Sequence, residues 1–201
     1  MNTDPAALTE LLTEIGACRR CADQLPQGPR PVLRAAVTAR LLVVGQAPGS
    51  RVHASGIPWD DASGERLRTW LGLDRTRFYD VERVAIVPMG FCYPGRGRTG
   101  DRPPRPECRR TWHPRLLPLL PRIELTLAIG RYAQAHFLPD RRSLSLTDTV
   151  RAWRQAPPGI VPLPHPSPRN IGWFRSNPWF EQELLPELRQ RVAQVLADTP
   201  V

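Results

Sequence analysis

The sequence predicts an α/β fold: a three-layer α/β/α sandwich around a central four-stranded, mainly parallel sheet. Four short apolar runs have the length of buried strands, and segments with helical spacing separate them. The runs are residues 41–45, 84–88, 125–129 and 160–163, and the separating segments are residues 65–71, 106–119 and 131–138. Strands that alternate with helices in this way form parallel sheets covered on both faces.

Two more helices are expected near the ends of the chain. Residues 6–17 carry apolar side chains at the spacing of one helix face, namely Leu8, Leu11, Leu12 and Ile15. Asn177 and Pro178 supply a cap and a first-turn proline for a last helix. Its buried face is expected to consist of Trp179, Leu184, Leu185, Leu188, Val192 and Leu196. Pro186 is expected to kink this helix.

Length and composition are those of one globular domain spanning residues 1–201. Hydrophobic residues make up 41% of the 201 residues, which is enough for a buried core. No apolar run approaches the roughly 20 residues that span a bilayer, and residues 1–14 do not have the pattern of a signal peptide. We therefore expect a monomer in the cytoplasm of a bacterial-type cell, away from the membrane.

The charge is strongly positive, and arginine alone provides it. The formal net charge is +9, and all 28 basic residues are arginine because the chain contains no lysine. Guanidinium groups bind phosphate through two hydrogen bonds and stack on bases, so this composition favours a polyanionic partner. The absence of lysine also excludes catalysis through a lysine Schiff base.

Four cysteines form a pattern that is typical of metal ligation. Cys18 and Cys21 are separated by two residues, and Cys92 and Cys108 follow at a distance. Disulfides are rare in a reducing cytosol, whereas four thiolates suit zinc or an iron–sulfur cluster. The ligand count does not separate these two metals, and four unrelated buried cysteines are the remaining alternative. A thioredoxin-like pair is disfavoured because the C-x2-C segment follows a helix.

Two unusual loops are expected to meet at one edge of the sheet. The first follows the first strand and reads GQAPGSRVHASGIPWDDASG over residues 45–64. The second follows the last strand and reads HPSPRN over residues 165–170. Because the carboxyl ends of parallel strands lie at the same edge, these loops predict one composite site.

In these motifs the chain resembles the uracil-DNA glycosylase superfamily. It is most similar to the iron–sulfur type called family 4, which reads GEAPG, then G-x-P-F, and later an HPS or HPA motif, with similar cysteine spacing. The corresponding segments here are residues 45–49, 56–59 and 165–167. The resemblance implies a [4Fe-4S] cluster on the four cysteines and DNA as the partner. It also implies base excision repair by hydrolysis of the bond between a damaged or deaminated base and deoxyribose, without lyase activity.

The resemblance further implies catalytic roles for Asp61, His165 and Gln46. His165 would donate a hydrogen bond to the base as its negative charge develops. Gln46 stands where family 4 has a glutamate, and glutamine cannot act as a general base. Asp61 lies in a D-A-S-G stretch similar to that of family 5 and is the expected substitute, although it could instead cap the following helix. His53 and Asp60 are the next candidates.

The remaining implied site residues would contact the base or the DNA. Trp59 stands where the family has a stacking phenylalanine, with a place in the core as its alternative. Substrate-binding residues are expected to be Ala47, Pro48, Gly49, His53, Trp59, Met89 and Gly90. DNA-binding residues are expected to be Ser167, Pro168, Arg169, Asn170 and Arg175. Pro88 occupies the place of an asparagine that reads uracil, so the identity of the base stays open, with the backbone of residues 89–91 as a possible reader.

Two rival functions remain open. Gln46 and Pro88 favour an iron–sulfur DNA-binding or sensing member of the superfamily that has weak catalysis or none. A cluster-bearing protein that acts on a free nucleotide or on RNA is the other alternative. Asp61, Trp59 and the HPSPRN motif favour the glycosylase.

Overall fold

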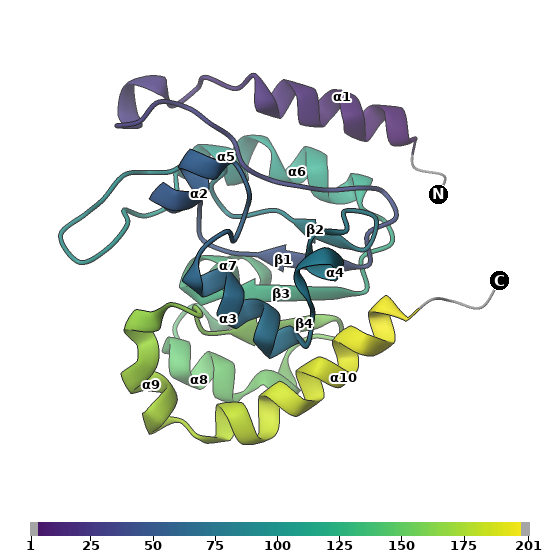
Figure 1. Ribbon diagram of the computed structural model, residues 1–201, viewed down its shortest axis with the longest axis vertical. Coiled ribbons are helices and arrows are strands. Elements are labelled where there is room, and N and C mark those ends of the chain that lie inside the picture. The colour runs from purple at the N-terminus through teal and green to yellow at the C-terminus, as the bar shows by residue number, and fades with distance from the viewer. Residues whose placement is uncertain (1–3, 198–201) are drawn as a thin grey trace.

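The computed structural model describes residues 4–197 and contains a four-stranded sheet in which every strand is parallel to its neighbours (Figure 1). The strand order is β2-β1-β3-β4. The strands are β1 (Leu41–Val44), β2 (Val84–Ile86), β3 (Leu125–Ile129) and β4 (Ile160–Leu163). The predicted fold class and all four strands are confirmed, although β1 and β2 end one and two residues earlier than expected.

Helices cover both faces of the sheet because side chains of each strand alternate between two hydrophobic clusters. Leu41 and Val43 of β1 belong to one cluster, and Leu42 and Val44 belong to the other. The second cluster lies beneath α1 (Pro5–Gly16), α5 (Pro106–Thr111), α6 (His113–Leu116) and α7 (Gly130–Phe137). The first is covered by α3 (Ala62–Leu71), α4 (Arg75–Tyr79), α8 (Leu146–Arg151), α9 (Ile171–Ser176) and α10 (Leu185–Leu196). These two helical layers complete the three-layer sandwich (Figure 1).

Prolines divide two helices that the sequence pattern presents as continuous. The segment predicted over residues 106–119 consists of α5, α6 and a 3-10 turn at Leu117–Leu119. Pro114 and Pro118 lie in the first turns of the second and third pieces, because proline has no N–H for an interior helical bond. Near the C-terminus a π-helical turn at Phe180–Leu184 precedes α10, and Pro186 lies at the start of that helix. Pro186 therefore marks a break between two helical segments.

Asn177 does not cap the last helix with its side chain, in contrast to the prediction. Its amide oxygen accepts a hydrogen bond from the indole of Trp179 at 3.1 Å, and its amide nitrogen donates to the Trp173 carbonyl at 2.9 Å. The neighbouring indole takes the acceptor that a backbone N–H would otherwise use. Short helices such as α2 (Ser50–Ser55) and α4 were not predicted because they are too brief for a periodic pattern. None of the helices within residues 4–197 is long and apolar enough to cross a membrane.

Candidate active site

A cavity of about 400 Å³ opens at the carboxyl ends of the strands, between the loops that follow β1 and β4. The expectation that these loops form one composite site is therefore confirmed. Its volume lies in the range of small-ligand sites. Of the residues predicted for the site, the cavity is lined by Gln46, Ala47, Pro48, Gly49, Trp59, Asp61, His165, Ser167, Pro168 and Arg169. The wall also contains residues that were not predicted, including Val32, Ser50, Arg51, Ser63, Tyr93, Arg96 and Asp101.

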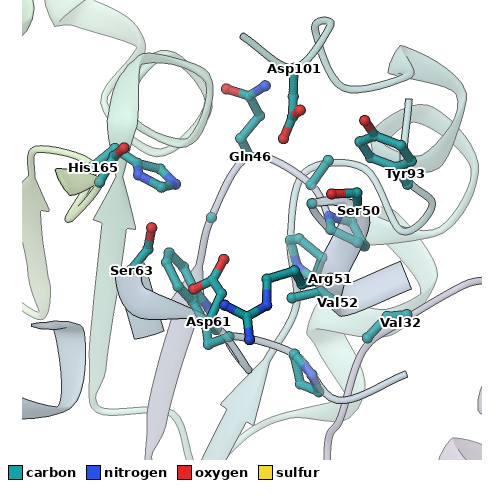
Figure 2. A pocket seen from close by; sticks show the side chains of 18 of the residues that line it. Val32, Gln46, Ser50, Arg51, Val52, Asp61, Ser63, Tyr93, Asp101 and His165 are labelled. Carbon is teal, nitrogen blue, oxygen red and sulfur yellow. The ribbon is translucent and has the colours of Figure 1, made fainter. Parts of the chain in front are cut away.

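Asp61 caps α3 and lines the cavity at the same time. Its Oδ1 accepts a hydrogen bond from the Gly64 backbone N–H at 2.8 Å, which fixes the side chain at the start of the helix. Figure 2 shows its carboxylate at the cavity wall, on the side opposite Gln46. The two roles considered for this residue are therefore compatible. The runner-up Asp60 instead forms an ion pair with Arg75 at 2.8 Å and does not line the cavity.

Trp59 has a left-handed backbone conformation, and its ring lies beside both motif loops. Its φ angle is 59°, which is unusual for a bulky residue and costs on the order of 1–3 kcal/mol. The ring lies against Gly45, where an added Cβ would come within 2.8 Å of it. It also lies 5.6 Å from the imidazole of His165, measured between ring centroids, at an interplanar angle of 32°. One aromatic face of the cavity is thus held next to the HPS motif.

The close approach of Trp59 to Gly64 gives a direct test of this geometry. A Cβ at Gly64 would lie 1.8 Å from the Trp59 carbonyl oxygen, a distance that requires the backbone to move. We expect Gly64→Ala to lower the free energy of unfolding by about 3 kcal/mol, as overpacking of a rigid site does. Urea unfolding measures the change. Gly16→Ala is the matched control, because a Cβ there meets nothing within 4 Å; equal stability of the two variants would contradict the arrangement.

His165 presents a free imidazole to the cavity (Figure 2). Burial lowers the pKa of His165, and the negative charge of Asp61 acts in the opposite direction. The ring is therefore neutral at neutral pH, with one N–H donor and one acceptor. Within residues 4–197 neither ring nitrogen has a hydrogen-bond partner, whereas the His165 carbonyl accepts from the Asn170 amide at 2.8 Å. Asn170 thus holds the loop, and the imidazole stays available for a ligand.

A family model described as the uracil DNA glycosylase superfamily matches residues 33–189. The chain belongs to the uracil DNA glycosylase superfamily. The matched segment contains both motif loops together with Cys92 and Cys108, and it begins after Cys18 and Cys21. Membership in this superfamily indicates a DNA glycosylase.

Gln46, the residue predicted to stand in place of the family-4 acid, directs its side-chain amide to another loop. Its Nε2 donates to the Arg102 carbonyl at 3.0 Å, so the side chain tethers a loop that lies 56 positions away along the chain. Its backbone carbonyl accepts from the Gly90 N–H at 2.9 Å. The glutamine therefore acts structurally on both sides of the cavity.

The backbone N–H groups of residues 89–91 are all engaged in hydrogen bonds, as are the carbonyls of Pro88 and Phe91. The Met89 N–H donates to the Gly45 carbonyl at 2.9 Å, and the Phe91 N–H donates to the Cys108 sulfur at 3.4 Å. The Pro88 carbonyl lies 3.0 Å from Nε2 of His113, a histidine whose pKa burial lowers to about 4. Pro88 lines the cavity, whereas Met89 and Gly90 do not. The N–H groups of residues 89–91 are consequently not free to read a base.

Two further predicted residues lie outside the cavity wall. His53 packs near Tyr93, with ring centroids 6.1 Å apart, and its Nδ1 is buried without a hydrogen-bond partner in the described part of the chain. Arg175 is exposed on α9. Tyr93 and Asp101, which do line the cavity, belong to the loop between the last two cysteines. The presence of an acid in that glycine-rich loop was the only sequence signal for them.

The four cysteines converge on a second, much smaller cavity. Cys18, Cys21, Cys92 and Cys108 line it together with apolar groups that include Phe91 and Trp112, and none of the four forms a disulfide. Burial raises the pKa of Cys92 to about 11 and that of Cys108 to about 12. Among residues 4–197 no group of three or more His, Cys, Asp or Glu side chains has the geometry of a single-ion site. Four convergent thiols in apolar surroundings nevertheless match the donor set of an iron–sulfur cluster.

Proposed function

We propose that this protein is a monofunctional DNA glycosylase that hydrolyses the N-glycosidic bond of uracil or another deaminated base in DNA. The observation that carries the proposal is the convergence of Asp61, Trp59 and His165 on one cavity within the superfamily fold. These residues provide a carboxylate, an aromatic face and a neutral imidazole. Each of these groups can help a base to leave deoxyribose. The aromatic face stacks on the base, the imidazole stabilises the negative charge that the base gains, and the carboxylate stabilises the positive charge on the sugar.

In the proposed reaction a flipped base enters the cavity and stacks against Trp59. As the C1′–N bond breaks, the bonding electrons stay with the base and the sugar becomes cationic. The neutral imidazole of His165 donates a hydrogen bond to the base oxygen and stabilises its negative charge. The carboxylate of Asp61 stabilises the sugar cation and orients the water that adds to C1′. The products are the free base and an abasic site.

The DNA-binding surface is proposed to surround the mouth of this cavity. Ser167, Pro168 and Arg169 line the mouth, and Arg169 and Arg175 are exposed. Pro168 and Arg169 would fill the space that the flipped base leaves, while Arg175 would contact phosphate. The net charge of +9 supports attraction to the DNA backbone.

A catalytically weak or inactive DNA-binding protein of the same superfamily is the second candidate. Gln46 favours it, because the side chain at the position of the acid is neutral and donates to the Arg102 carbonyl. The two candidates differ in whether a base is released.

An incision assay tests the function. DNA with a single uracil, hypoxanthine or xanthine, in duplex and single-stranded form, is incubated with the protein and then treated with alkali. We expect base release from at least one of them, an intact abasic site before alkali, and no adduct trapped by borohydride. A trapped adduct would contradict simple hydrolysis, and failure to release any of the three bases would leave the non-catalytic candidate.

We also propose that Cys18, Cys21, Cys92 and Cys108 hold a [4Fe-4S] cluster. Their convergence on one apolar cavity and the resemblance to the iron–sulfur glycosylases support this. Bound there, the cluster would link Cys18 and Cys21, in the segment after α1, to Cys92 in the loop after β2 and to Cys108 within α5. This cross-link would hold the N-terminal helix on the sheet.

The cluster assignment predicts the metal content of the protein. Anaerobically purified protein is expected to be brown and to contain iron and acid-labile sulfide, because thiolates are the ligands of such clusters. Cys108→Ser is expected to lose most of the iron and to expose α1 to proteolysis. Metal analysis of parent protein produced with added zinc is the control. Stoichiometric zinc without iron or sulfide in the anaerobically purified parent would contradict the cluster assignment and indicate a zinc site.

A further inference from the structure

The loop between β2 and α5 forms a small hairpin at the mouth of the active-site cavity. The Gly97 N–H donates to the Gly100 carbonyl at 2.6 Å, and the Arg102 N–H donates to the Gly95 carbonyl at 2.8 Å. Arg96 and Asp101 form the bridge between the two sides. Backbone hydrogen bonds therefore give this loop its shape.

This hairpin contacts both motif loops of the site. The Gln46 amide donates to the Arg102 carbonyl at 3.0 Å, which ties the hairpin to the first motif. Gly100 lies against Arg169 of the second motif, since a Cβ there would come within 3.2 Å of the guanidinium. A Cβ at Gly49 would lie 3.6 Å from Oδ2 of Asp101, so the carboxylate sits beside the first motif. Figure 2 shows Asp101 above the cavity next to Gln46, across the cavity from Asp61.

The Asp101 carboxylate forms no ion pair with a residue that the structure describes. No arginine nitrogen lies within 4 Å of it in the part of the chain that the structure describes. Burial raises the pKa of Asp101, and the negative charge of Asp61 acts in the same direction. Arg169, Arg96 and the Tyr93 hydroxyl act in the opposite direction. The two carboxylates are therefore electrostatically coupled across one cavity.

We propose that Asp101 is a second catalytic carboxylate, which replaces the acid that the first motif lacks. Gln46 has a neutral side chain, which cannot act as an acid or a base. Its hydrogen bond to the Arg102 carbonyl instead anchors the loop that carries Asp101 to the cavity. Asp101 would accept the proton of the water whose oxygen bonds to C1′, while the C1′–N electrons leave with the base. The proton then passes to solvent. This inference rests on the proposed glycosylase function. In it Asp61 stabilises the sugar cation and Asp101 accepts the proton of the attacking water.

Two carboxylates on one glycosidic bond have a clear physical rationale. Glycosidases commonly place a pair of acids around an oxocarbenium-like transition state, with distinct roles set by their environments. Asp61 has one oxygen committed to the Gly64 N–H, so its charge is fixed in position. Asp101 lies on the exposed hairpin at the cavity mouth, where its side chain also interacts with the Tyr93 hydroxyl. A carboxylate that water can reach is able to accept a proton and pass it on to solvent.

The test compares Asp101→Asn with Asp140→Asn, a control at an exposed acid on the 3-10 turn Pro139–Arg141. The first measurement is binding to two uncleavable duplexes, one with a neutral tetrahydrofuran abasic analogue and one with a cationic pyrrolidine analogue. The second is the single-turnover rate of base release as a function of pH. The binding measurement does not require catalysis, so it separates failure of this inference from failure of the proposed function.

We expect the parent and Asp140→Asn to bind the cationic analogue at least 10-fold more tightly than the neutral one. Asp101→Asn is expected to lose part of this preference, because Asp61 keeps its own charge in the cavity, and to bind the neutral analogue within about 3-fold of the parent. Its single-turnover rate is expected to fall by about 100-fold or more, as loss of a general base does. The acid limb of the parent's pH profile, where a carboxylate with a raised pKa becomes protonated, is expected to disappear.

Other results overturn the inference in distinguishable ways. Unchanged rate and cation preference in Asp101→Asn, with an active parent, would mean that Asp101 has no catalytic role. A change in base preference alone would make it a specificity residue. A parent that neither binds the abasic analogues nor releases a base would remove the proposed function, and this inference with it.

Discussion

Asp61→Asn is expected to lower the rate of base release by about 100-fold or more while the protein folds and binds DNA almost normally. The substitution removes a negative charge from the cavity wall. Asparagine caps a helix nearly as well as aspartate, so the hydrogen bond from the Gly64 N–H can be kept. The loss therefore reports on charge at the reacting sugar rather than on the start of α3. Single-turnover kinetics and urea unfolding measure the two effects.

A matched control exists in α4. Asp74 caps that helix by accepting from the Arg77 N–H at 2.7 Å, and it does not line the cavity. Asp74→Asn is expected to retain full activity and to show a similarly small change in stability. If Asp61→Asn releases base at the parent rate, the acid that stabilises the sugar lies elsewhere in the site. If both variants are equally stable and only Asp61→Asn is slow, the capping role is separated from catalysis.

His165→Ala is expected to lower the rate by about 100- to 1,000-fold, the usual effect of removing one donor to a developing oxyanion. His165→Gln retains an N–H donor and is expected to recover part of the loss. Because burial lowers the pKa of His165, its neutral form persists as the pH falls through the ordinary histidine range. The contribution of the neutral imidazole is thus expected to be constant through that range and to change only at lower pH.

The control for His165 is His136→Ala. His136 also has a pKa lowered by burial, yet it packs beside His113 and Phe137, away from the cavity wall. It is expected to leave the rate unchanged. Equal rates for the glutamine and alanine variants at position 165 would show that the imidazole does not act as a hydrogen-bond donor.

Strands and long helices were predictable because each has a local cause. β3 and β4 match their expected bounds, since continuous apolar runs are buried on both faces of a parallel sheet. Two predicted helices are divided at prolines in the structure. Whether a proline kinks a helix or starts a new one depends on the turns next to it, which the sequence pattern does not specify. At Asn177 the local pattern predicted a helix cap, but the side-chain oxygen of Asn177 accepts a hydrogen bond from the indole N–H of Trp179 instead. A single-residue side-chain contact of this kind has no signature in a hydrophobic pattern.

The sequence by itself determined the fold class, the superfamily and the edge of the sheet where the site lies, because these follow from apolar periodicity, strand order and two compact motifs. Only the tertiary structure decided how the site is completed. Gln46 and Arg102 are 56 positions apart, and their 3.0 Å hydrogen bond brings Asp101 to the cavity. The backbone N–H groups of residues 89–91 are engaged by partners that lie far away along the chain or around the cysteines. Such pairings arise from the long-range packing of loops, which no local spacing of residues records.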